Sequence, residues 1–148
     1  MESVEYNDIA KILGGSKVFG ISRWTSVSWM KQIEKGFPFL ALEHIKETLD
    51  LKDDDLSQIL EVSTKTTSRW RRQDIPRLPV PVSDRIYRFA RLFALAEQVL
   101  EDKDAAREWL HDGQVGLGGR TPIDMMRTEA GAREVESLLV RIEHGVLS

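Results

Sequence analysis

The chain has 148 residues, of which 41% are hydrophobic and 30% are charged, and its formal net charge is −3. This is an ordinary composition for a folded protein, so extensive disorder is not expected. The absence of cysteine excludes disulfide bonds and Cys-ligated metal sites. No signal-peptide pattern opens the sequence, and no stretch reaches the roughly 20 apolar residues of a membrane span. We therefore expect a cytoplasmic protein.

Apolar residues recur at helical spacing along the chain, and no segment alternates in the manner of a half-buried strand. The sequence therefore predicts an all-α protein. The expected helices cover residues 5–14, 26–35, 39–49, 53–60, 64–73, 83–100, 103–112, 121–127 and 132–144. Several of them begin after serine, threonine or aspartate and end before glycine or proline, the usual residues at helix ends.

Three of the five prolines lie within residues 74–82, and we place a domain boundary there. The predicted organisation is an N-terminal helical extension over 1–38, a helical hairpin region over 39–75, a Pro-rich linker over 76–82 and a second helical domain over 83–148. The extension carries Trp24 and Trp29. It is interpreted either as a cap on the core or as a second interaction surface, and the sequence does not choose between them.

A basic segment lies inside an otherwise acidic chain. Residues 64–91 hold only two acids, Asp74 and Asp84, beside eight bases: Lys65, Arg69, Arg71, Arg72, Arg77, Arg85, Arg88 and Arg91. The flanking segments 43–61 and 97–148 are both acidic. Such a local concentration of cations is typical of a nucleic-acid footprint, although a solvated helix face has the same composition.

Residues 55–74 have the pattern of a helix-turn-helix. Ser63 is placed to cap the second helix, while Thr67 and Trp70, three residues apart, are expected to face the core. The outward face then offers hydroxyls and cations to bases and phosphates. The predicted DNA-binding residues are Thr64, Lys65, Ser68, Arg69 and Arg72.

The segment resembles the helix-turn-helix of Xre- and Cro-like repressors, most closely in Ile59-Leu60, Val62-Ser63 and Ser68-Arg69-Trp70-Arg71. Two positions depart from that pattern. Glu61 stands where the turn often has glycine, which tolerates a left-handed backbone. Thr67 stands where an aliphatic residue is usual. These departures concern the affinity for DNA more than the fold.

The C-terminal part resembles the toxin-binding domain of the Xre/MbcA/ParS antitoxin family. The resemblance rests on Trp109-Leu110, Leu117-Gly118-Gly119, Thr121-Pro122, Thr128, Gly131, Val135, Leu138, Ile142 and Gly145. Trp109 is expected to be a large buried anchor. Met125 and Met126 are interpreted as core residues. Gly131 is expected to permit a sharp entry into the last helix.

The resemblance implies an antitoxin that neutralises a RES-type toxin, whose domain is similar to ADP-ribosyltransferases and consumes NAD. It also implies that the last helix and the tail carry much of the contact. The candidate toxin-binding residues in this sequence are Arg120, Arg141, Gly145, Val146, Leu147 and Ser148. We expect the apolar tail, residues 145–148, to reach the NAD cleft of the toxin, although a frayed end is the simpler interpretation.

No catalytic residue, metal site or cofactor is predicted. His44, His111 and His144 are not spaced as metal ligands, and no nucleophile–base motif is present. The expected partners are a cognate RES-domain toxin, operator DNA, and further copies of this chain in a homodimer or higher oligomer, with the apolar C-terminal helices as the interface. The alternative function is a stand-alone helix-turn-helix regulator without a toxin.

Overall fold

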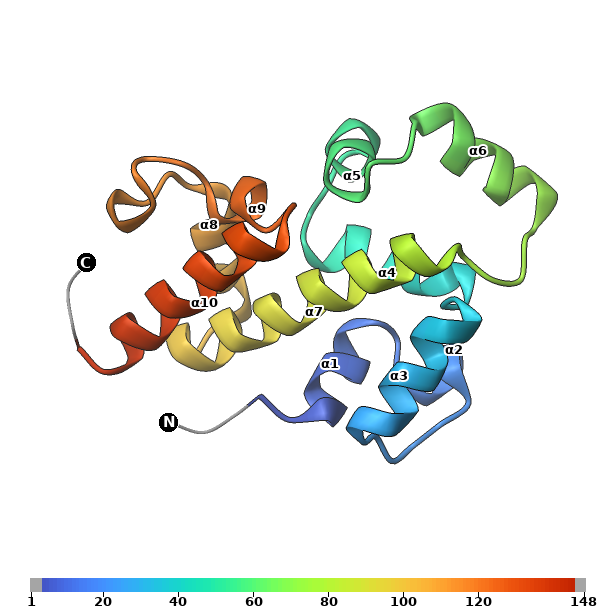
Figure 1. Ribbon diagram of the computed structural model, residues 1–148, viewed down its shortest axis with the longest axis horizontal. Helices are drawn as coiled ribbons and strands as arrows, with labels where there is room; N and C mark the ends of the chain where they lie inside the picture. Colours follow the sequence, from blue (N-terminus) through green and yellow to red (C-terminus); the bar gives the residue numbers. More distant parts are fainter. Residues whose placement is uncertain (1–3, 146–148) are drawn as a thin grey trace. The chain divides into compact units, whose positions relative to one another are not determined.

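The computed structural model describes residues 4–145, and these form helices with no β-strand among them (Figure 1). The predicted all-α class is confirmed. None of the helices in this part of the chain is long and apolar enough to cross a bilayer.

The described residues divide into two compact units, each with its own core. The N-terminal unit, Glu5–Ala90, holds α1 (Tyr6–Ile12), α2 (Ser16–Phe19), α3 (Ser26–Lys35), α4 (Phe39–Thr48), α5 (Asp53–Leu60), α6 (Thr64–Gln73) and the first half of α7 (Val80–Leu100). The C-terminal unit, from Arg91 onward together with Val4, holds the rest of α7, α8 (Lys103–His111), the 3₁₀ turn η1 (Val115–Leu117), α9 (Pro122–Met125) and α10 (Glu129–Glu143).

Most predicted helices are present, with shifted ends. The short helix α2 was not predicted, because four residues are too few to show a period. Helix α9 stops at Met125, two residues before the expected end. Helix α10 begins at Glu129 rather than at 132, because the Thr128 hydroxyl accepts the N–H of Gly131 and caps the helix earlier.

Residues 76–82, predicted to be a linker, are instead held against the N-terminal unit. The N–H of Leu78 donates to the carbonyl of Phe37 at 2.8 Å, and Arg77 donates to the carbonyl of Gly36 at 3.1 Å. Helix α7 begins at Val80, since proline is tolerated in a first helical turn. The division between the units falls at Ala90, inside α7.

Ser83 was expected at the start of this helix, which the sequence placed over residues 83–100. It lies inside that helix, fully buried, where its hydroxyl donates to the Pro79 carbonyl at 3.1 Å and accepts the Phe37 N–H at 2.7 Å. The serine thus satisfies a buried backbone donor that is 46 positions away along the chain.

An aromatic cluster shows what the N-terminal extension does. Trp24 and Trp29 stack with ring centroids 4.0 Å apart, and Phe19 meets both of them edge-on. Phe37 and Tyr87 complete the cluster, and Tyr87 lies outside the extension, in α7. The described part of the extension is therefore a cap on the core, one of the two interpretations left open by the sequence.

The core of the C-terminal unit contains Phe93, Leu110, Met126, Val135 and Leu139, all fully buried. Gly131, in the first turn of α10, lies against the end of α9. A Cβ atom at this position would collide with the carbonyl oxygen of Met125. Glycine is thus required here by close packing of the two helices and not by an unusual backbone angle.

Candidate functional site: the helix-turn-helix and the C-terminal surface

The turn between α5 and α6 is held by side chains at both ends. The Ser63 hydroxyl accepts the N–H of Thr66 at 3.0 Å, so the predicted cap of α6 is confirmed. Glu61 adopts the left-handed backbone that glycine usually supplies, with φ of 55°. Arg85 stabilises this turn. Its guanidinium lies 2.7 Å from the Glu61 carboxylate and donates to the Leu60 carbonyl at 3.2 Å.

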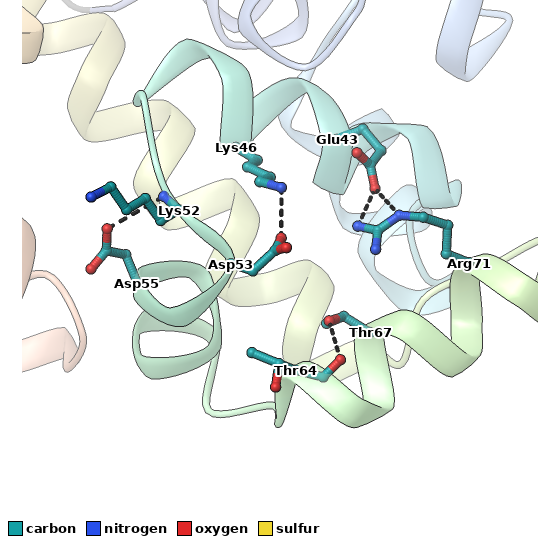
Figure 2. Close-up of polar contacts among 8 residues, drawn as sticks. All are labelled: Glu43, Lys46, Lys52, Asp53, Asp55, Thr64, Thr67 and Arg71. Carbon is teal, nitrogen blue, oxygen red and sulfur yellow. Dashed lines mark hydrogen bonds and ion pairs between the residues drawn. The ribbon is translucent and has the colours of Figure 1, made fainter.

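The inner face of α6 is the one predicted. Thr67 and Trp70 are buried, with exposed fractions of 4% and 9%. The Thr67 hydroxyl donates to the carbonyl of Thr64 at 3.0 Å (Figure 2). A threonine is therefore accommodated where an aliphatic residue is usual, because its one polar group is already paired.

The outer face of α6 carries the basic character of this unit. All five predicted DNA-binding residues are exposed: Thr64, Lys65, Ser68, Arg69 and Arg72. Within residues 4–145, the side chains of Lys65, Arg69 and Arg72 have no ion-pair partner.

The other five bases of the predicted footprint contact polar or acidic groups of the same chain. Arg71 pairs with Glu43, Arg77 binds Gln32 and a carbonyl, Arg85 pairs with Glu61, Arg88 lies 3.8 Å from Asp84, and Arg91 pairs with Glu136. The eight-residue footprint of the sequence is thus reduced to three cations on α6, which all point outward.

Helix α4 contacts both helices of the motif through ion pairs (Figure 2). Lys46 lies 2.6 Å from Asp53 at the start of α5, and Glu43 accepts two bonds from Arg71 in the last turn of α6. The hydrogen bond and charge of Lys46, aided by the charge of Arg71, lower the pKa of Asp53 below its ordinary value of 3.8. This carboxylate is therefore ionised at neutral pH.

Arg120, one of the predicted toxin-binding residues, is exposed and lies 2.6 Å from Asp124. Arg127 contacts the same carboxylate at 3.2 Å. The hydrogen bond from Arg120, with that from Arg127, lowers the pKa of Asp124 below 3.8 in spite of its partial burial. Two guanidinium groups share one carboxylate, so this corner of the C-terminal unit has a net positive charge.

The loop before Arg120 is closed by its own hydrogen bonds. Gln114 donates its N–H to the Arg120 carbonyl at 3.1 Å and accepts the N–H of Gly119 at 2.9 Å. Gly118 and Gly119 both have positive φ, which glycine adopts without steric cost. The loop presents Val115, which is 88% exposed and was not singled out from the sequence.

Arg141 lies on the surface of α10 beside an open hollow. The hollow is lined by Arg133, Glu136, Ser137, Val140 and Arg141, which recur every three or four residues and so share one face of the helix. Gly145 follows α10 with φ of 74°. Val146, Leu147 and Ser148, the remaining predicted toxin-binding residues, lie outside the described residues.

Two expectations for the C-terminal unit are corrected. Trp109 is half-buried rather than a fully buried anchor, and Leu110 and Ala106 supply the buried face of α8. The apolar face of α10, expected to form a dimer interface, is buried within its own unit by Val135, Leu138 and Leu139. These three side chains are therefore not available to a second copy, while the expected homodimer stays a prediction. Met126 is fully buried, as predicted, whereas Met125 is half-buried.

Residues 4–145 contain no group of three His, Cys, Asp or Glu side chains that could hold a metal ion.

The sequence matches two family descriptions. Residues 28–91 match the Antitoxin Xre-like helix-turn-helix domain, and residues 95–145 match the Antitoxin Xre/MbcA/ParS C-terminal toxin-binding domain. Proteins named Antitoxin Xre from Photorhabdus laumondii and Yersinia enterocolitica are each 32% identical over 117 residues, which is 78% of this chain and 78% of theirs. This chain belongs to the Xre family of antitoxins.

A third protein named Antitoxin Xre, from Pseudomonas putida, is 32% identical over 114 residues, 77% of this chain and 70% of its own. The fold is similar to that of a chain in the crystal structure of the M. tuberculosis MbcT–MbcA toxin–antitoxin complex. That likeness has a TM-score of 0.53 and 21% identity, and it covers 72% of this chain and 94% of the other. This Xre protein is thus an antitoxin of a toxin–antitoxin system, with a helix-turn-helix domain and a toxin-binding domain. Residues 4–27 lie outside both family matches.

Proposed function

We propose that this antitoxin binds and neutralises a cognate RES-type toxin, which consumes NAD, through its C-terminal unit. The proposal is carried by the match of residues 95–145 to a toxin-binding domain. It is supported by three groups of that unit that reach the surface, which are the exposed Arg120 beside the closed loop, the exposed Val115 in η1 and the half-buried Arg141 on α10. Together they offer cations and an apolar contact, the usual mixture of a protein interface.

The tail, residues 145–148, completes this proposed surface. It continues from α10 through Gly145 and carries the apolar pair Val146 and Leu147. In the proposal these residues enter the NAD cleft of the toxin and block it, while Arg120 and Arg141 bind the rim. An apolar tail that occupies a cleft excludes both water and substrate, so it would inhibit the toxin without any chemistry of its own.

Co-expression of the toxin with the full chain and with a chain lacking residues 146–148 tests the tail. We expect the full chain to protect cellular NAD, and the shortened chain to lose at least about tenfold in toxin affinity. Val115→Asp tests the loop in the same assay, with Val27→Asp as the control, because Val27 is also exposed (54%) but lies in the N-terminal unit. Unchanged protection by the shortened chain would refute the role of the tail.

For the helix-turn-helix we propose binding to the operator of its own operon, as a dimer whose two copies of α6 enter successive major grooves. The three outward cations without an internal partner support this role, because phosphate binding needs cations that are not already neutralised. A stand-alone regulator would bind DNA in the same way. It would differ in having no toxin that co-purifies with the full chain.

A further inference from the structure

Helix α4 carries two ion-pairing side chains on one face, and each of them contacts a different helix of the DNA-binding motif. Glu43 and Lys46 are three residues apart and are therefore neighbours on the helix surface. Lys46 pairs with Asp53 in the first turn of α5, and Glu43 pairs with Arg71 in the last turn of α6 (Figure 2). One short helix thus contacts the motif at both of its ends.

Arg71 is held more closely than an ordinary surface ion pair. Its Nε and Nη2 atoms both donate to Oε1 of Glu43, at 3.0 and 2.7 Å. Its guanidinium carbon also lies 5.7 Å from the ring centre of Phe39, the first residue of α4. A planar guanidinium held by two donated bonds and an aromatic ring has little rotational freedom. Arg71 is therefore directed at α4 and away from the outward face of Lys65, Arg69 and Arg72.

We propose that Glu43 is a positioning residue for DNA recognition: through Arg71 it fixes the C-terminal end of α6 on α4, so that Arg69 and Arg72 reach the bases together. This inference rests on the proposed DNA binding. The buried contacts of Thr67 and Trp70 fix the face that α6 turns inward. The ion pair between Glu43 and Arg71 then limits how far the C-terminal end of α6 can tilt relative to α4. This tilt decides how far each outward side chain extends.

The charge of Glu43 by itself predicts a different effect. Glu43 is an anion next to the surface that would meet phosphates, so its removal should raise the affinity for any DNA. Positioning predicts instead that removal lowers the affinity for the operator relative to other DNA, because base contacts need exact geometry while phosphate contacts do not. The ratio of operator affinity to the affinity for other DNA therefore distinguishes them: charge alone leaves this ratio unchanged, whereas loss of positioning lowers it.

The experiment uses the full chain with Glu43→Gln, titrated against the operator duplex and a scrambled duplex of equal length at one salt concentration. We expect the ratio of the two affinities to fall by about three- to tenfold. Glu47→Gln is the matched control, because Glu47 lies one turn further along α4, is exposed, and has no ion-pair partner among residues 4–145. It removes the same charge without touching α6, and its ratio should equal that of the unmodified chain.

Arg71→Gln tests whether Glu43 acts through Arg71. The double variant Glu43→Gln with Arg71→Gln should lose no more specificity than either single change, since both remove one interaction. All titrations are made well below the unfolding temperature of each variant. A ratio for Glu43→Gln equal to that of Glu47→Gln would overturn the inference. Failure of the unmodified chain to prefer the operator would instead refute the proposed DNA binding itself.

Discussion

The two units of this antitoxin differ in how they use their arginines. In the N-terminal unit, α6 keeps Lys65, Arg69 and Arg72 without internal partners, while Arg71 and Arg85 hold the motif together. In the C-terminal unit Arg91, Arg107, Arg120, Arg127 and Arg133 are paired with carboxylates, and among its six arginines only Arg141 has no ion pair within residues 4–145. Unpaired cations are suited to binding a polyanion such as DNA, and arginines paired with carboxylates are suited to binding another protein.

This difference makes the two proposed activities respond differently to salt. Binding that depends on unpaired cations and phosphates weakens steeply as salt rises. Binding that depends on Val115, an apolar tail and largely neutralised arginines should change much less. Variants of one unit should therefore leave the partner of the other unit bound.

The largest expected effect comes from replacing Lys65, Arg69 and Arg72 together by alanine. Operator affinity should fall by at least about a hundredfold, because phosphate and base contacts are lost together, and the dependence on log salt should become shallower by about one for each lost phosphate contact. Fluorescence anisotropy over a salt series measures both quantities. Toxin binding should be unchanged.

A charge-matched control accompanies this triple variant. Lys17, Lys31 and Lys35 are exposed in the same unit but lie on α2 and α3. Their joint replacement by alanine removes the same charge and should lower operator affinity only slightly. Equal losses in the two triple variants would mean that α6 is not the DNA-binding element.

A smaller effect is expected from Gly131→Ala, which forces α9 and α10 apart. The added methyl group would meet the Met125 carbonyl, so the C-terminal unit should lose about 2 kcal/mol of its free energy of unfolding. Toxin binding should weaken while operator binding persists. Calorimetry and the two binding assays would show this, with the exposed Glu134→Ala on α10 as a control. Loss of DNA binding as well would show that the units are not independent.

A still smaller effect is expected at the strained turn. Glu61→Gly and Glu61→Ala both remove the ion pair with Arg85, but only glycine relieves the left-handed backbone. The glycine variant should therefore be more stable than the alanine variant by about 1 kcal/mol. Urea denaturation of both variants measures the difference. Equal stabilities would mean that the backbone of residue 61 is not strained.

The smallest effect concerns pH. The pKa of Asp53 is lowered in the folded chain, so its pair with Lys46 stabilises the fold above the ordinary value of 3.8 and loses this contribution as the pH falls through the lower, folded value. Lys46→Met should therefore lower the unfolding temperature slightly at neutral pH and hardly at all once the pH is below the lowered, folded pKa of Asp53. Because Asp53 is exposed, the shift should also shrink in high salt. An effect that grows in acid would contradict this assignment.

Much of the fold could be predicted because its signals are local. Apolar spacing indicated the helices, and Ser63 and Thr121 have the residue types that cap α6 and α9. The inner and outer faces of α6 also follow from helical periodicity, so the exposure of the predicted DNA-binding residues was available from the sequence.

The errors have a common cause in contacts between distant segments. The prolines of residues 76–82 resemble those of a linker, but the bond between Leu78 and Phe37 holds the segment in place. Ser83 looks like a cap, but it serves a backbone group of Phe37. Apolar residues on α10 look like an interface, yet neighbouring helices of the same unit already cover them.

The sequence by itself determined the all-α class, the helix-turn-helix and the antitoxin family, since each depends on periods and spacings along one segment. Only the tertiary structure decided which of the eight bases remain free. Pairing depends on which acid lies within about 4 Å, and the partners of Arg71, Arg85 and Arg91 are 28, 24 and 45 positions away along the chain. Arg88 differs, because its partner Asp84 is only four positions away. No local pattern encodes the longer separations, so only the folded chain distinguishes the three cations of α6 from Arg71, Arg85 and Arg91.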